Sequence, residues 1–381
     1  METTELTRIT ELMTHFAVNT GLDPEFSSPV RYLWTDAFAV CNYMGLYNLT
    51  GDAHYFDLGT KLINQVHQVL GKLRDKSGWI SGLDKKTGEK HPTIGGLRIG
   101  KKMDEREQNQ EYDEILEWER DGQYYHYITK WIHALNITAK VSGDAKYLQW
   151  AGELLKTAHD AFTYSPAPNV PTRLYWKMSV DLKRPLVSSM GQQDPMDGYV
   201  TYKETETLSA MFDGQRYEME INEISSICKM MDLKTNDPLG IGGLLTDATR
   251  TTQMMIYGSI KRPEILENLL NSALFGIKSY RVTGQLALNP EHRLAFRELG
   301  LSIGFKGLEI MEKCIENNPE IFISTHLKQL KQLQNYRYMV RYIDEFWLDP
   351  KNQDSMNWKE HMDINIVMLA TAMYPDGFLI I

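Results

Sequence analysis

The 381-residue sequence has few cysteines, no long apolar segment and no excess of basic residues. Its three cysteines, Cys41, Cys228 and Cys314, are far apart and odd in number, which predicts reduced core thiols and no disulfide framework. No run approaches the roughly 18 apolar residues that a membrane-spanning helix needs. Because the net charge is −9, no basic stripe is available to bind nucleic acid. We therefore expect neither a membrane nor a nucleic acid as a partner.

The start of the chain and the absence of known catalytic signatures bear on the location of the protein and on its cofactors. Residues 1–6 are acidic and lack the apolar region of a signal peptide, so we expect a cytoplasmic protein. The Gly-rich segments 95–100 and 240–243 neither follow a strand nor complete a phosphate or dinucleotide loop. No spacing of Ser, Cys, His and acidic residues marks a nucleophile set or a metal site. We therefore expect no cofactor and no metal.

A short phrase that occurs twice indicates the architecture. Thr-Gly-Asp-Ala-His-Tyr at 50–55 returns as Ser-Gly-Asp-Ala-Lys-Tyr at 142–147. Each copy follows an apolar helical run and opens another one. Glycine is favoured directly after the end of a helix, which is the expected place of Gly51, and aspartate is favoured as an N-cap, which is the expected place of Asp52. A repeated helix, tight corner and helix predicts an array of helical hairpins.

Helical periodicity continues along the whole chain, and strand-like alternation is scarce. The expected helices span about 3–18, 29–49, 52–73, 122–141, 145–162, 194–211, 216–231, 237–257, 263–280, 291–314, 319–346 and 358–373. They form six hairpins, which can close into a ring of six inner and six outer helices in one domain over residues 1–381. The fold class is therefore all-α.

These features resemble a known superfamily. The Trp-Thr-Asp-Ala-Phe start at 34–38, the Gly-Asp corner and the recurring hairpin are similar to the six-hairpin, or (α/α)6 toroid, glycosidase-like superfamily. It includes unsaturated glucuronyl hydrolases, glucoamylase-like enzymes and N-acylglucosamine 2-epimerases. The resemblance implies a carbohydrate-active enzyme whose active site lies at the end of the ring where outer helices connect back to inner ones.

Two of those connections are long, at about 74–120 and 164–193, whereas the inner-to-outer corners are short. Long loops in a compact domain are usually functional or disordered. These two contain Trp79, Ile80, Tyr175 and Trp176, so we expect them to cover one mouth of the ring and to wall a cleft there.

The first turns of the inner helices supply the candidate catalytic residues. Asp36 lies inside an apolar run and needs a partner, either an ion pair with Arg31 or a polar cavity where it acts as acid or base. Asp194 is expected to be the N-cap of its helix, with Asp197 in the first turn. Alternatively, the two carboxylates bind sugar hydroxyls or act as acid and base.

The histidines and an internal acid–base pair leave similar alternatives open. His126, among aromatic residues, is either a core residue or a proton-transfer group, and His361 begins the last helix. His361 and Asp363 do not share a helix face. Asp247 and Arg250 are spaced to form an internal salt bridge. The expected substrate-binding residues are Arg31, Trp34, Gln123, Tyr124, Trp176, Gln193, Arg250, His292 and Asp363.

Three functional hypotheses follow from these residues. In a glycoside hydrolase, Asp36 and either Asp194 or Asp197 would flank the glycosidic bond, about 6.5–9.5 Å apart for inversion. In a sugar epimerase or isomerase, His126 and His361 would move a proton on opposite faces of a carbon beside a carbonyl. The third hypothesis is a non-catalytic ring that serves as a scaffold or binds a small ligand. In the enzyme hypotheses, the partner is a small molecule, a saccharide.

Overall fold

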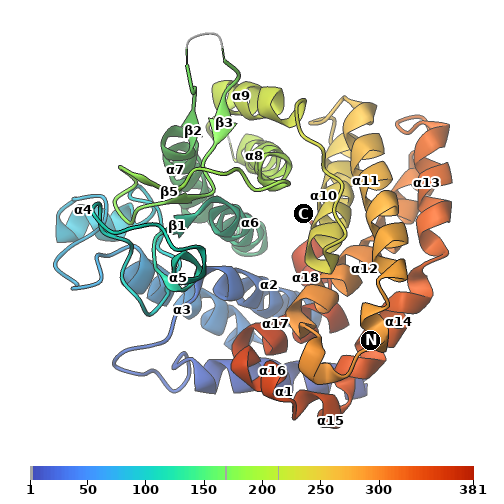
Figure 1. The fold of residues 1–381 in the computed structure, drawn as a ribbon, viewed down its shortest axis with the longest axis horizontal. Helices are drawn as coiled ribbons and strands as arrows, with labels where there is room; N and C mark the ends of the chain where they lie inside the picture. Colours follow the sequence, from blue (N-terminus) through green and yellow to red (C-terminus); the bar gives the residue numbers. More distant parts are fainter. Residues whose placement is uncertain (1–2, 168–169, 213) are drawn as a thin grey trace. The chain divides into compact units, whose positions relative to one another are not determined.

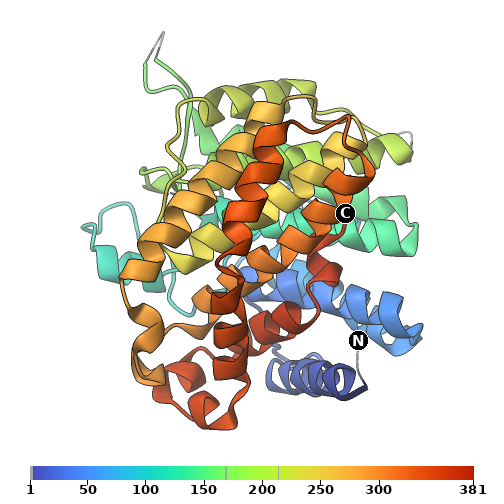
Figure 2. The same cartoon turned by 90° about the vertical axis from the view of Figure 1, so that its right-hand side faces the viewer.

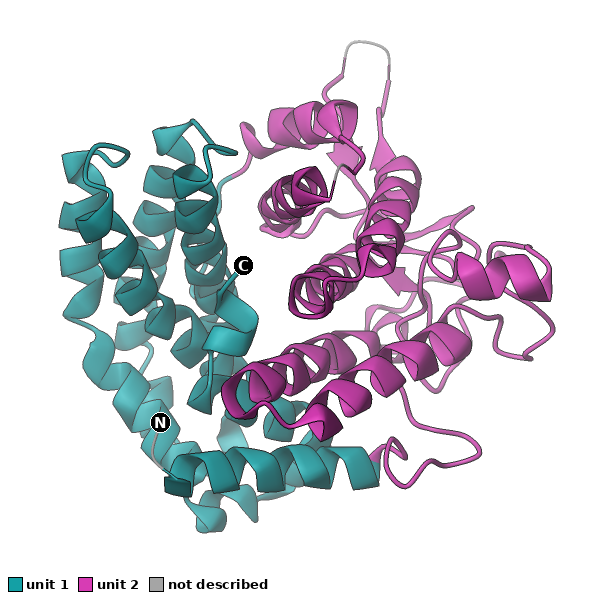
Figure 3. Ribbon diagram, turned by 180° about the vertical axis from the view of Figure 1, so that it is seen from behind, with its two compact units in different colours: residues 1–19, 232–381 teal, residues 20–231 magenta. Residues whose placement is uncertain are grey.

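The computed structural model describes residues 3–167, 170–212 and 214–381 and is dominated by helices (Figure 1). The chain divides into two compact units, shown in Figure 3. Unit 1 consists of residues 1–19 and 232–381, and unit 2 of residues 20–231. The single ring domain expected from the sequence stays a prediction. None of the helices in the described part of the chain combines the length and hydropathy that crossing a bilayer requires.

Unit 2 contains three helical hairpins. Its long helices are α2 (Leu33–Thr50), α3 (Ala53–Leu70), α6 (Tyr125–Ser142), α7 (Ala145–Phe162), α8 (Asp194–Met211) and α9 (Glu218–Cys228). Helix α6 packs between α2 and α8. The hairpin partners are α3 for α2, α7 for α6 and α9 for α8. Helices α2 and α8 are buried on almost every side, whereas α3 and α7 bury one face. This difference fits the expected inner and outer positions.

The repeated corner has the predicted geometry. Gly51 and Gly143 both adopt the left-handed conformation, with φ of 71° and 68°. The Asp52 side chain accepts a hydrogen bond from the backbone N–H of His54, and Asp144 accepts one from Lys146. Both motifs end one helix and cap the next within three residues. The corner expected at 213–215 begins at Asp213, which lies outside the described residues.

The long connections of unit 2 are more ordered than the sequence indicates. The first contains the short helices α4 (Lys85–Lys90) and α5 (Glu114–Glu119) and is followed by strand β1 (Gln123–Tyr124). The second contains or adjoins the strands β2 (Thr163–Tyr164), β3 (Arg173–Leu174), β4 (Lys177–Met178) and β5 (Pro185–Val187). Strand β4 lies between β1 and β5, and both pairings are antiparallel. This sheet joins the second connection to the residues that begin α6.

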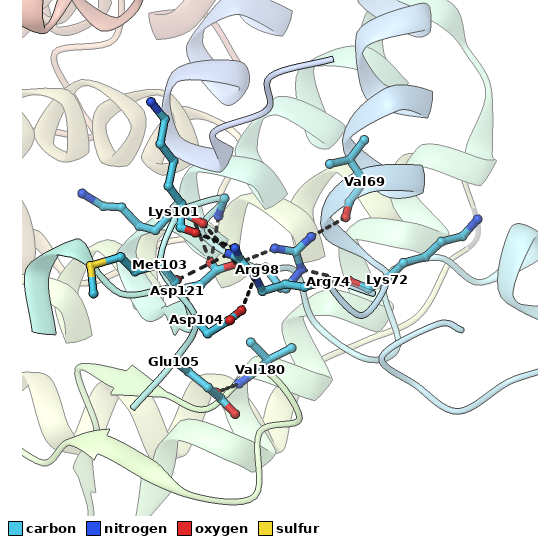
Figure 4. A network of polar contacts seen from close by, with 12 residues as sticks. Val69, Lys72, Arg74, Arg98, Lys101, Met103, Asp104, Glu105, Asp121 and Val180 are labelled. Atoms are coloured by element: carbon cyan, nitrogen blue, oxygen red, sulfur yellow. Dashed lines mark hydrogen bonds and ion pairs between the residues drawn. The ribbon is translucent and has the colours of Figure 1, made fainter. Parts of the chain in front are cut away.

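A buried ion-pair network holds the first long connection (Figure 4). Asp121 is fully buried, and its Oδ2 accepts hydrogen bonds from Arg98 at 2.5 Å and Arg74 at 3.2 Å. Arg74 also donates to the backbone carbonyls of Lys101 and Lys102, at 2.5 Å each. Because these charges are paired and hydrogen-bonded, the connection is fixed against the body of the unit.

Unit 1 contains the remaining helices. These are α1 (Thr3–Asn19), α10 (Pro238–Ile256), α11 (Pro263–Val282), α12 (Ala295–Asn317), α13 (Ser324–Gln334), α14 (Arg337–Leu348), α15 (Pro350–Gln353), α16 (Met356–Glu360), α17 (Met362–Met373) and α18 (Asp376–Leu379), with 3₁₀ turns η1 (Gln285–Ala287) and η2 (Pro290–His292). Helix α10 packs on α11 and α12, and α12 also contacts α17. Helix α1 packs on α17, as expected for the sixth companion helix.

Two predicted helices of this unit are divided. The run expected at 319–346 is two helices, α13 and α14, which follow one another along the unit (Figure 2). They are separated by a turn at Asn335 and Tyr336, where the N–H of Tyr336 bonds to the carbonyl of Leu333. The run expected at 358–373 breaks at His361, the N-cap of α17. Periodicity alone missed both breaks because apolar residues continue on either side.

Candidate functional site

Aromatic side chains gather around the start of α6. We call this group, formed by Tyr32, Trp118, Tyr124, His126, Tyr127 and Trp176, the aromatic cluster. The Trp176 ring lies nearly parallel to the His126 ring, with centroids 6.1 Å apart and an interplanar angle of 14°. Trp176 also contacts Tyr124 at 5.2 Å and Trp118 at 4.7 Å. All of the cluster belongs to unit 2, and it includes one tryptophan from each long connection.

Local structure explains how the cluster is positioned. Tyr124 pairs with Lys177 across β1 and β4 and is the N-cap residue of α6, so the strand directs the first turn of the helix. Tyr32 is the N-cap residue of α2, and its hydroxyl lies 2.7 Å from that of Tyr127. The cluster therefore joins two neighbouring helix starts.

His126 and Asp194 face each other across α6 and α8. His126 Nδ1 lies 3.7 Å from Asp194 Oδ2, and both atoms are buried without a hydrogen-bond partner among the described residues. The His126 side chain is nevertheless 28% exposed. Because Nδ1 is buried, this exposure belongs to the opposite edge of the ring, which carries Nε2.

The N-cap expected at Asp194 is wrong by one residue. Helix α8 has Gln193 as its N-cap residue, and Asp194 is the first helical residue with Pro195 after it. The Asp194 side chain is therefore not used for capping and is directed to His126 instead. Gln193, an expected substrate-binding residue, is half-buried at this helix start.

Asp197 is tied to α6 one turn further on. Its Oδ1 accepts a hydrogen bond of 2.5 Å from the Lys130 ammonium, and its Oδ2 accepts one from the Thr129 hydroxyl. Lys130 and Asp197 are largely buried, with side chains 15% and 9% exposed. This pair fixes the register of α8 against α6 and so places Asp194 opposite His126.

Asp36 forms the ion pair that the sequence offered as one alternative. Its Oδ1 lies 3.4 Å from Arg31 Nη1, and its Oδ2 accepts the backbone N–H of Tyr32 at 2.9 Å. Arg31 also donates to the carbonyl of Thr20. Asp36 is 1% exposed and Arg31 is 2% exposed, so both side chains hold the start of α2.

Two other predicted binding residues of unit 2 are buried. Gln123 accepts from the N–H of Leu97 and donates to the carbonyls of Gly95 and Val180, so it joins the two long connections. The Trp34 ring packs on Phe38, with centroids 4.4 Å apart. Tyr124 and Trp176 lie in the aromatic cluster, where Tyr124 is buried and Trp176 is half-buried.

The remaining predicted residues belong to unit 1. Arg250 is buried and pairs with Asp247 at 3.3 Å, as the spacing predicted for a salt bridge. His361 Nδ1 lies 3.0 Å from the carbonyl of Asn357, and Asp363 is half-buried in the first turn of α17. His292 is exposed in η2. The roles predicted for these residues stay predictions.

Burial sets the protonation state of the phenols near His126. It raises the pKa of Tyr32 to about 12, and Glu119 and Asp121 add to this effect, whereas the hydrogen bond with Tyr127 opposes it. Burial also raises the pKa of Tyr124. Both hydroxyls are therefore neutral at physiological pH.

Sequence reasoning missed Tyr32, Trp118 and Lys101. The Lys101 ammonium lies 5.6 Å from the centre of the Tyr32 ring. Trp118 is 45% exposed, and a tryptophan in a long connection was the available signal for it.

In the described part of the chain, no group of three His, Cys, Asp or Glu residues is arranged to hold a metal ion.

Comparison with solved structures identifies the fold. One similar structure is the family GH76 α-mannanase of Bacteroides thetaiotaomicron, with a TM-score of 0.56 and 9% identity over 96% of this chain and 95% of that one. Another is an inactive variant of the GH76 α-1,6-mannanase of Salegentibacter sp. HEL1_6 in complex with α-1,6-mannotetrose, with a TM-score of 0.54 and 12% identity over 97% and 99%.

A third similar structure is the cellobiose 2-epimerase of Spirochaeta thermophila DSM 6192, with a TM-score of 0.52 and 10% identity over 99% and 98%. No protein-family model matches the sequence, and a search of curated proteins finds no match. The structural likeness confirms the predicted all-α, (α/α)6 toroid fold.

Proposed function

We propose that the protein is a carbohydrate-active enzyme in which His126, oriented by Asp194, transfers a proton to or from a saccharide. The observation that carries the proposal is the approach of Asp194 to His126, a member of the aromatic cluster. The similar structures include a mannanase bound to mannotetrose and a cellobiose 2-epimerase, which supports a saccharide as the ligand.

The pair has the geometry of an oriented base. A carboxylate beside Nδ1 favours the tautomer with its proton on Nδ1, which leaves the lone pair on Nε2. Nε2 lies on the exposed edge of the ring, where it can reach a substrate. When Nε2 takes up a proton, the Asp194 carboxylate stabilises the resulting imidazolium. The pair tightens from 3.7 Å as charge develops on the ring.

The aromatic cluster supplies a surface for sugar rings. Trp176 and Trp118 are partly exposed and contact each other edge to face. Such side chains present an apolar face to the C–H groups of a sugar and a polar edge to its hydroxyls. We propose that the two long connections, which bring Trp118 and Trp176 to α6, form a wall of the substrate site.

The arrangement favours epimerisation or isomerisation over hydrolysis. Glycoside hydrolysis uses one carboxylic acid and one carboxylate at the bond that is broken. Asp36 is committed to Arg31, and Asp197 is committed to Lys130. The inactive mannanase variant carries replacements of two adjacent aspartates, whereas this sequence contains no two adjacent aspartates. A histidine base suits removal of a proton beside a carbonyl.

Hydrolysis is the second candidate, because Asp194 reaches the cluster and can act as a carboxylic acid there.

Epimerisation and hydrolysis differ in their products. Wild-type protein would be incubated with cellobiose and with α-1,6-mannobiose in D₂O, and the products separated by chromatography and analysed by mass spectrometry. Epimerisation gives a new disaccharide that carries deuterium on carbon, whereas hydrolysis gives monosaccharides without carbon-bound deuterium.

The variant His126→Gln tests the proposed role. We expect its kcat to fall by about 100-fold or more, as for loss of a general base. His54→Gln is the matched control, because His54 is exposed at the start of α3. Full activity in His126→Gln would exclude His126 as the proton-transfer group. Saccharide binding without turnover in the wild type would instead support the non-catalytic hypothesis.

A further inference from the structure

Unit 2 contains a recess that shares no residue with the aromatic cluster. Its volume is about 740 Å³, within the range of about 300–1,000 Å³ typical of small-molecule sites. It is lined by the loop at 25–29, by α3 from Asp57 to Val69, by the turn at 72–76 and by Arg98. This recess uses outward-facing residues of α3, and nothing in the reaction proposed above requires it.

The recess contains a buried acceptor without a donor. Gln65 is 7% exposed, and its Nε2 donates to the carbonyl of Gly21 at 3.3 Å. Because the nitrogen of the amide makes this bond, the remaining amide atom is the oxygen, Oε1. It has no hydrogen-bond partner among the described residues. A buried amide oxygen without a donor is unfavourable. A ligand that brings an O–H group would therefore be stabilised here.

Most charged groups of the recess are already engaged by other protein groups. Lys61 lies 3.6 Å from Asp23 and 3.7 Å from Glu25. Arg74 and Arg98 both pair with Asp121. The Lys72 ammonium donates to Gln68 at 2.6 Å and lies 4.9 Å from the centre of the Trp79 ring. Among the charged lining residues, only Asp57 and Lys76, which are exposed and opposite in charge, have no ion-pair partner or hydrogen bond of the side chain among the described residues. The engaged charges favour a neutral ligand over an ion.

The remaining lining groups combine amides with an apolar surface. Asn64 and Gln68 are exposed one turn apart on α3 and add amide donors and acceptors beside Gln65. The Phe26 ring is 45% exposed and is held against Gly21, where a Cβ atom would lie 2.3 Å from it. Amides beside a fixed aromatic ring match the hydroxyls and the C–H face of a sugar.

From these features we propose that the recess is a second saccharide-binding site, for a neutral oligosaccharide or polysaccharide chain, which holds the chain without reacting with it. This proposal rests on the proposed function in one respect only, that the ligand is a saccharide. It assigns Gln65, Asn64 and Gln68 as hydrogen-bonding residues and Phe26 as the stacking residue.

Native electrophoresis in gels that contain α-1,6-mannan or hydroxyethylcellulose tests the second site. Both polymers are neutral, and binding slows migration. The double variant N64A/Q68A changes only exposed residues, and W176A changes the aromatic cluster. We expect N64A/Q68A to bind polymer about tenfold more weakly while turning over cellobiose or mannobiose like the wild type. We expect W176A to lose turnover but to keep most of the retardation.

The outcomes separate the two proposals. Equal retardation of wild type and N64A/Q68A, or no retardation of the wild type in either gel, would overturn the second site. A wild-type protein that is slowed in the gel but turns over no saccharide would refute the proposed reaction and leave the second site supported, provided that N64A/Q68A is not slowed.

Discussion

Arg98 donates a hydrogen bond of 2.5 Å to Asp121, and this buried ion pair joins the first long connection of unit 2 to the residues before α6. Asp121 also accepts from Arg74 and from the backbone N–H of Gly100. The carboxylate therefore compensates two guanidinium groups and fixes the chain three residues before Tyr124. Its loss is expected to affect both stability and the aromatic cluster.

We expect Asp121→Asn to destabilise unit 2 by about 3 kcal/mol or more, because it leaves Arg98 buried without its carboxylate. This corresponds to a decrease of roughly 6–12 °C in the melting temperature, measured by calorimetry. Asp104→Asn is the matched control, since Asp104 also pairs with Arg74 but its side chain is 83% exposed. The control is expected to cost less than about 1 kcal/mol. Equal decreases in both variants would contradict this account.

The sequence predicted the elements well because their signals are local. The Gly-Asp corners and the Asp-Pro helix start at Asp237 depend on residues within one turn of each other. The ion pairs of Asp36 with Arg31 and Asp247 with Arg250 are local in the same way. Such contacts are fixed once the helix forms, so spacing alone is enough to anticipate them.

The pairing within the candidate site could not be predicted in this way. His126 and Asp194 belong to different helices, and their approach depends on the register of α8 against α6. That register is set by the bonds of Asp197 to Lys130 and Thr129, which form only after the helices pack. The arrangement of Trp118 beside Trp176 likewise depends on the folding of both long connections.

Replacing the carboxylate behind His126 tests the proposed mechanism. Asp194→Asn keeps the shape of the side chain but removes the charge that stabilises the imidazolium. We expect kcat for the saccharide to fall by about 10²–10⁴-fold, with a smaller change in KM. Asp160→Asn, an exposed change on α7, is the control. Should KM rise while kcat is unchanged, Asp194 would be a binding residue and the proton-transfer role would be lost.

Close packing of α10 on α12 depends on glycine. A Cβ atom at Gly242 would lie 2.1 Å from the carbonyl oxygen of Gly300, which is backbone and cannot rotate away. We expect Gly242→Ala to push the helices apart and to destabilise unit 1 by about 1–3 kcal/mol. Gly78→Ala is the control, because no described residue apart from its two chain neighbours has an atom within 4 Å of its Cβ position. Calorimetry would show a lower melting temperature for Gly242→Ala alone; an unchanged value would mean that the helices adjust without cost.

A buried histidine makes unit 2 sensitive to acid. The Trp131 indole donates a hydrogen bond of 3.1 Å to His67 Nε2, which requires the neutral ring. Burial lowers the pKa of His67 to about 3, from an ordinary value of 6.5. Between these values the unfolded chain takes up a proton that the folded chain does not. The folded state is therefore fully favoured above pH 6.5 and loses this stability as the pH falls toward 3.

This contribution amounts to about 2 kcal/mol between pH 7 and pH 5. His67→Gln keeps an acceptor for the Trp131 indole but cannot titrate, so we expect it to lose about 2 kcal/mol less than the wild type over that interval. Urea unfolding at both pH values, followed by tryptophan fluorescence, measures the difference. The exposed His54 provides the control variant, His54→Gln, which should lose as much stability as the wild type. An equally large acid loss in His67→Gln would show that other groups cause the sensitivity.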